Sequence, residues 1–127
     1  MQNTLSGKRV LITQAGEFMG PVLCEVFTAQ GATVVASTEP LSEPDAAERV
    51  VRAAGSIDVL VANLAFTAPT TLATAVSEAE WRAAFAALVD PLPRLVRAAA
   101  PAMIERRSGK ILVIGSASAL RGMKRAS

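Results

Sequence analysis

Residues 8–20 read KRVLITQAGEFMG, and this stretch decides the fold. It begins as a short β-rich apolar run, residues 8–13, and continues into a turn of small and polar residues. From Met19 to Gln30 apolar residues recur with helical spacing, and Gly31 then stops the helix. The stretch predicts a buried strand that leads through a tight turn into a helix.

Three further apolar runs repeat this pattern: ATVVAS at 32–37, IDVLVA at 57–62 and KILVIG at 110–115. Because these strands are continuously apolar rather than alternating, we expect them to be buried on both faces, as in a parallel sheet covered by helices. With helices between them, the chain is predicted to be α/β: a Rossmann-like, doubly wound parallel sheet with helices on both faces.

Helix signals fill the segments between these strands. After a Pro/Ser/Glu-rich loop at 38–44, Asp45 can cap a helix that runs to about Ala54. Ser77 and Glu80 have the spacing of a capping box and predict the start of a long helix that runs to about residue 107. Prolines 91 and 93 are expected to bend or interrupt that helix.

Composition excludes several classes of function. No apolar run approaches the roughly 18 residues that span a bilayer, and the N-terminus has no secretory pattern, so we expect a cytoplasmic protein without membrane contact. The net charge is only +2 and the basic residues are scattered, which argues against nucleic-acid binding. The chain has no histidine and one cysteine, so no Ser-His-Asp triad, internal disulfide or metal site is expected. Cys24 lies on an apolar helix face and is predicted to be core.

Five segments together resemble the short-chain dehydrogenase/reductase superfamily: GKRVLIT at 7–13, GATVVAS at 31–37, SIDVLVAN at 56–63, SEAEW at 77–81 and GKILVIGSASA at 109–119. The resemblance covers essentially the whole chain and implies that Ser116 is the catalytic serine. In that family a tyrosine follows about a dozen residues later, with a basic residue four positions after it. Both would lie beyond Ser127, so we expect residues 1–127 to be the N-terminal half of a single Rossmann-type domain.

The turn after the first strand departs from the family pattern. Dehydrogenases carry T-G-x-x-x-G-x-G there, because glycine lets the backbone approach the pyrophosphate at a helix N-terminus. Here Gln14 and Phe18 occupy the first two glycine positions, and only Gly20 remains. A phenylalanine fills space that a dinucleotide needs, and Glu17 adds a carboxylate beside a phosphate site.

Three other departures point the same way. Residues 38–56 are too few for more than one helix, so the strand that carries the adenine-contacting aspartate is missing or rudimentary. The family's N-N-A-G motif appears as ANLA at 62–65, and its relay asparagine falls on Leu88. Together these changes remove the pyrophosphate turn, the adenine edge and the relay asparagine.

Within the superfamily, this pattern resembles the halohydrin dehalogenases, which have Thr-x4-Phe/Tyr-x-Gly in place of the glycine-rich turn. The resemblance implies a cofactor-independent, reversible conversion of a vicinal halohydrin to an epoxide and a halide, with epoxide opening by small anions. It implies a halide and substrate pocket that includes Phe18, Thr13, Asn63 and Leu64. Ser116 would hydrogen-bond the substrate oxygen, and the tyrosine beyond residue 127 would take its proton.

Two other interpretations stay open. One is an NAD- or NADP-dependent oxidoreductase with an atypical turn, in which Gln14, Gly20, Glu39 and Asn63 contact the nucleotide. The other is a non-catalytic protein that keeps the fold for oligomerisation. The helix around residues 83–102 corresponds to the family's tetramer surface, which implies a homotetramer or homodimer under any of these interpretations. Phe18 could also be an ordinary core aromatic beneath the first helix.

Overall fold

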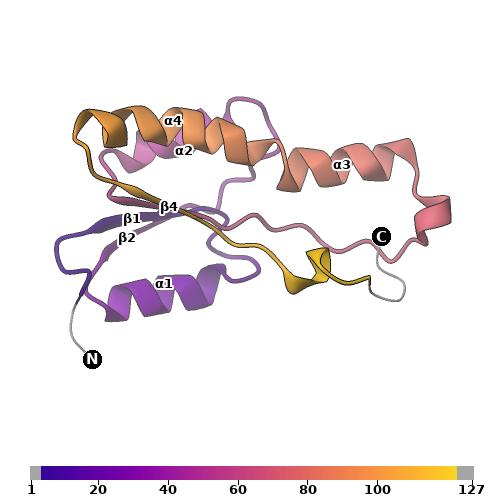
Figure 1. Ribbon diagram of the computed structural model, residues 1–127, viewed down its shortest axis with the longest axis horizontal. Coiled ribbons are helices and arrows are strands. Elements are labelled where there is room, and N and C mark those ends of the chain that lie inside the picture. Colours follow the sequence, from indigo (N-terminus) through magenta and orange to yellow (C-terminus); the bar gives the residue numbers. More distant parts are fainter. Residues whose placement is uncertain (1–3, 123–127) are drawn as a thin grey trace.

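The computed structural model describes residues 4–122, and all four of its strands are parallel (Figure 1). The elements in chain order are β1 (Arg9–Ile12), α1 (Gly20–Ala29), β2 (Thr33–Ala36), α2 (Ala46–Ala54), β3 (Val59–Ala62), α3 (Glu78–Leu88), α4 (Pro91–Glu105) and β4 (Lys110–Val113), with short 3-10 turns at Ala73–Ala75 and Ala117–Ala119. The strand order is β2-β1-β3-β4. This arrangement confirms the predicted Rossmann-like sheet.

Helices cover the sheet on both sides. In Figure 1, α1 lies on one face, α2 and α4 lie on the other, and α3 extends beyond the ends of the strands. The strands alternate between the two layers: Val10 and Ile12 of β1 belong to the core on the α1 side, and Leu11 belongs to the core under α2 and α4. Cys24 of α1 packs against the first of these cores, as predicted.

The two central strands and the two edge strands differ in burial. Every residue of β3 is buried, and so is β1 after its first residue, but every residue of β2 and β4 is exposed or half-buried. The prediction that all four strands are buried on both faces is therefore wrong for β2 and β4. Each of them has a sheet neighbour on only one side among residues 4–122, so one flank stays open.

The long helix predicted to begin after Ser77 is two helices. α3 ends at Leu88, and α4 begins at Pro91, where the missing N–H costs nothing because first-turn amides lack intrahelical acceptors. The capping box at the start of α3 is present as predicted. Asp45 occupies the N-cap position of α2, but its side chain makes no capping hydrogen bond and pairs with Arg49 instead.

The segment between β2 and β3 is as short as the sequence indicated. It contains the helix α2 and no strand. Consequently β2 is an edge of the described sheet, with no strand on the side where dehydrogenases of the family carry their adenine-contacting aspartate.

Candidate functional site

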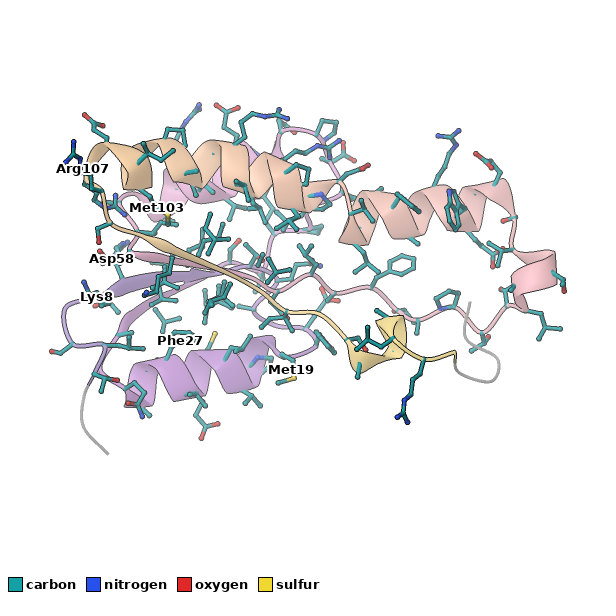
Figure 2. All side chains as sticks on the ribbon, in the orientation of Figure 1. Lys8, Met19, Phe27, Asp58, Met103 and Arg107 are labelled. Carbon is teal, nitrogen blue, oxygen red and sulfur yellow. The ribbon has the colours of Figure 1, made fainter. Side chains whose placement is uncertain are left out.

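The candidate site lies at the carboxyl ends of β1 and β3. These strands are neighbours in the sheet, so the turn after Ile12 and the loop after Ala62 emerge side by side. Ligands of open parallel sheets bind at this edge. Met19 marks it in Figure 2, at the beginning of α1. A cleft of about 650 Å³ lies at the opposite, amino edge, beside Lys8, Asp58, Met103 and Arg107. We place the site at the carboxyl edge, because that is where the family's motif residues gather.

Hydrogen bonds from buried side chains to backbone carbonyls join the turn to the loop. The hydroxyl of Thr13 donates to the Asn63 carbonyl at 2.9 Å, and the Asn63 amide nitrogen donates to the carbonyls of Gln14 and Glu17, each at 3.0 Å. Thr13 and Asn63 are fully buried. The two carbonyl acceptors fix the orientation of the Asn63 amide, whose oxygen is buried without a partner among the described residues.

Gln14 keeps the backbone conformation of a glycine while it adds a side chain. Its φ is 43°, in the left-handed region that costs a non-glycine residue about 1 kcal/mol. The carboxamide pairs with the backbone of Ala65, accepting its N–H at 3.0 Å and donating to its carbonyl at 3.2 Å. This buried side chain therefore fills the gap between turn and loop that a glycine would leave open.

Phe18, at the second missing glycine, is also left-handed, with φ 51°. Its exposed fraction is 61%, so the alternative of a core aromatic sealed beneath α1 is wrong. The strain at Phe18 is held by neighbouring bonds in the turn, where Glu17 N–H donates to Gln14 and Gly20 N–H donates to Glu17.

Two positions at the start of α1 offer no backbone donor to an anion. The N–H of Gly20 is bonded to Glu17 at 2.8 Å, Pro21 has no N–H, and Leu23 N–H is bonded to Met19 at 2.9 Å. Gly20 itself is required by packing, because a Cβ there would overlap the backbone of Ala15. A helix N-terminus binds phosphate through free amides, and here Gly20 and Pro21 supply none.

The remaining predicted residues occupy different environments. Leu64 is buried in the core under α2 and α4, and Leu88, at the relay position, is the half-exposed last residue of α3. Ser116 follows β4 and is exposed; its hydroxyl oxygen lies 2.7 Å from that of Ser118 and accepts the Ser118 N–H at 3.2 Å. The structure thus brings Thr13, Gln14 and Asn63 together and leaves Phe18 and Ser116 open to solvent.

Glu39, the acid expected near a ribose, is ion-paired. The guanidinium of Arg49 donates to one of its carboxylate oxygens at 2.9 and 2.5 Å and also pairs with Asp45. The hydrogen bond from Arg49 holds the pKa of Asp45 below its usual value. A nucleotide ribose would have to compete with Arg49 for Glu39.

Sequence reasoning missed the contact between Gln14 and Ala65. The only available signal was a polar residue of amide type at a glycine position, and it gives no hint of a partner 51 residues away.

Within residues 4–122, no cluster of three or more Cys, Asp or Glu residues could hold a metal ion. In the same part of the chain no helix is long and apolar enough to cross a bilayer.

Comparison with known proteins identifies the family. Residues 40–127 match the short chain dehydrogenase family, and the chain belongs to it. It is 27% identical to a 3-oxoacyl-[acyl-carrier-protein] reductase of Escherichia coli, covering 87% of this chain and 55% of that protein. It is 30% identical to a short chain dehydrogenase of Pseudocercospora fijiensis, covering 91% and 47%. The chain thus spans about half the length of the curated relatives it matches.

Solved structures of the same fold include a dehalogenation enzyme and a reductase in complex with NADPH. A protein described as a dehalogenation enzyme is 28% identical, with a TM-score of 0.84 over 94% of this chain and 58% of that one. The L-sorbose reductase of Gluconobacter frateurii, solved with NADPH and L-sorbose, is 22% identical, with a TM-score of 0.88 over 99% and 59%. The first likeness agrees with the resemblance to halohydrin dehalogenases; the second supports the fold alone.

Proposed function

We propose that this chain forms the N-terminal half of a cofactor-independent halohydrin dehalogenase. The substrate would be a vicinal halohydrin and the products an epoxide and a halide, with the reverse reaction opening epoxides by small anions. The observation that carries the proposal is the turn after β1. There Gln14 and Phe18 take the glycine positions of the dehydrogenase pattern while keeping left-handed backbone angles. The dehalogenation enzyme among the structural relatives supports the same assignment.

The residues of this turn do not fit a nicotinamide dinucleotide, the cofactor of the family's dehydrogenases. The Gln14 carboxamide fills the space beside Ala65, and the Phe18 ring stands where a glycine would admit the pyrophosphate. The amide of Gly20 is committed and Pro21 has none. For these reasons the proposed reaction contains no step through a nucleotide.

In the proposed reaction, Ser116 positions the substrate oxygen with a hydrogen bond. A tyrosinate beyond residue 127, its pKa lowered by a neighbouring cation, accepts the hydroxyl proton. The resulting alkoxide attacks the adjacent carbon from behind; the new C–O bond closes the epoxide as the carbon–halogen bond breaks, and both bonding electrons leave with the halide. Phe18 would supply an apolar wall for that halide.

In this proposal Thr13 and Asn63 support the site and do not contact the substrate. Thr13 and Asn63 are buried and their donors are engaged within the protein, so we assign them to holding Phe18 and the turn in place. Leu64 would support the pocket from the core side. We further propose a homotetramer or homodimer, supported by the exposed Trp81 and half-exposed Phe85 on α3, whose rings lie in a tilted contact with centroids 4.7 Å apart.

The alternative, an NAD(P)-dependent oxidoreductase, is favoured by the reductases among the relatives. Calorimetric titration of the complete protein with NADH and with NADPH separates the two functions. The dehalogenase proposal predicts no saturable binding at millimolar nucleotide. Micromolar affinity for either nucleotide would overturn it and assign Gln14, Gly20, Glu39 and Asn63 to a nucleotide site.

A further inference from the structure

A second cleft is lined by residues of α2, of α4 and of the loop before α2. In Figure 1 these two helices lie on the face of the sheet opposite α1. The volume of the cleft is about 380 Å³, which falls within the range of small-molecule sites. The lining residues are Pro44, Glu48, Val51, Arg52, Arg94, Arg97 and Ala98. Three guanidinium groups therefore surround a pocket that also has small apolar side chains.

Two of the three arginines of this cleft have no partner for their side chains among the described residues. Arg49 and Arg82 form ion pairs outside the cleft, and Arg52 pairs with Glu48 at 2.5 Å. The side chains of Arg94 and Arg97 make no ion pair or hydrogen bond within residues 4–122. One terminal nitrogen of Arg94, Nη1, is buried and has no hydrogen-bond acceptor. A buried charged donor without an acceptor is costly, so this arrangement leaves a demand for an anion.

One helix dipole adds to this charge. Arg94 lies in the first turn of α4, so the positive end of that dipole adds to the field of the arginines. On α2 the lining includes Val51 and Arg52 near the C-terminus, so the dipole of α2 adds no positive end there.

We propose that this cleft binds a phosphate dianion, free or as part of a small phosphomonoester. Arg52, Arg94 and Arg97 contribute three positive charges and Glu48 one negative charge, which leaves two positive charges, equal and opposite to those of the dianion. Guanidinium groups match the geometry of phosphate oxygens through paired N–H donors. Val51 and Ala98 provide an apolar surface for the remainder of an ester.

The site is independent of the proposed dehalogenase reaction. None of its lining residues belongs to the turn after β1, to the loop after β3 or to the segment around Ser116. Phosphate bound here would act as an effector or mark a second ligand, and a failure of either proposal leaves the other standing.

The experiment is a calorimetric titration of the complete protein with inorganic phosphate near pH 7.5, at constant ionic strength set with chloride. We expect saturable binding that weakens at least tenfold in Arg94→Gln and in Arg97→Gln. Arg97 is exposed, so its replacement does not endanger the fold. Glu48→Gln, which removes the one acid of the cleft, should tighten binding several-fold. Arg82→Gln on α3, which changes the net charge equally outside the cleft, should alter the affinity less than twofold.

Two results would overturn the site. One is an absence of saturable phosphate binding at tens of millimolar. The other is an equal loss in Arg82→Gln and Arg94→Gln, because it would mean that phosphate responds only to the net charge of the protein. If inorganic phosphate binds, a titration with glycerol phosphate distinguishes free phosphate from an ester: an affinity at least tenfold higher for the ester would assign the apolar surface to its organic part, and an equal or lower affinity would overturn that assignment.

Discussion

Replacement of Phe18 by alanine and by glycine should give an unusual order of stability. The residue is 61% exposed, so about 40% of its surface is buried. If that surface is about 200 Å², the ring buries about 80 Å², worth at most about 2 kcal/mol at 25 cal/mol per Å². Phe18→Ala should therefore cost less than the roughly 3–5 kcal/mol of a core phenylalanine.

Phe18→Gly should be more stable than Phe18→Ala by about 1 kcal/mol, because glycine adopts φ 51° without the steric cost that alanine retains. Phe85 is the matched control: it is a half-exposed phenylalanine inside α3, where glycine should be about 1 kcal/mol worse than alanine. Urea unfolding of the four variants measures both orders. A Phe18→Gly protein less stable than Phe18→Ala would refute the left-handed conformation at this turn.

The same variants test the halide wall. Chloride or bromide should inhibit ring closure as a product in the millimolar range, and both Phe18 variants should raise that inhibition constant several-fold. The Phe85 variants should leave it unchanged. A loss of 3–5 kcal/mol at Phe18→Ala with unaltered halide inhibition would mean that the ring is packing and not part of a pocket.

Three further outcomes follow from the structure. Ser116→Ala should lower turnover by about two to four orders of magnitude without loss of stability. The control Ser118→Ala, which removes the neighbouring hydroxyl, should change turnover less than about fivefold. Parental activity in Ser116→Ala would mean that Ser116 is only structural. Gln14→Ala should cost about 2 kcal/mol, because it removes both bonds to Ala65 and keeps the left-handed strain, whereas Gln14→Gly should cost less; the reverse order in urea would contradict this role. The pKa of Glu80 is lowered first by the Thr71 hydroxyl and then by the Ser77 N–H, so its contribution is present above the unfolded value of 4.5 and is lost as pH falls through the lower folded value. The protection of amides at the start of α3 against exchange, relative to the unfolded chain at the same pH, should therefore fall below that pH in the parent but not in Glu80→Gln. Identical pH profiles of protection would exclude the carboxylate.

The sequence predicted the four strands and their parallel direction well, because Val10, Leu11 and Ile12 form an apolar run that only a sheet covered on both faces can bury. It predicted the short connection through α2 for the simple reason that too few residues are present. It did not predict the exposure of β2 and β4, because an edge strand has the same apolar composition as a central one.

Details of the site depend on contacts between distant residues. The sequence placed Gln14 and Phe18 at glycine positions, but the sign of φ and the pairing with Ala65 follow from the loop after β3. Likewise, Asp45 is a residue type that caps helices, but its carboxylate forms an ion pair with the guanidinium of Arg49 and makes no capping hydrogen bond. Local patterns specify which groups are available, whereas the three-dimensional arrangement decides which of them pair.

The central claim is that this fold carries out dehalogenation without a nucleotide. The most direct measurement is halide release from a vicinal chloro- or bromoalcohol by the complete protein, freed of nucleotide by extensive dialysis, with epoxide quantified in parallel. Our account predicts one halide released per epoxide formed, at a rate unchanged by added NADH or NADPH and reduced at least a hundredfold in Ser116→Ala. Oxidation of the alcohol that requires a nucleotide, with the halogen retained, would contradict it.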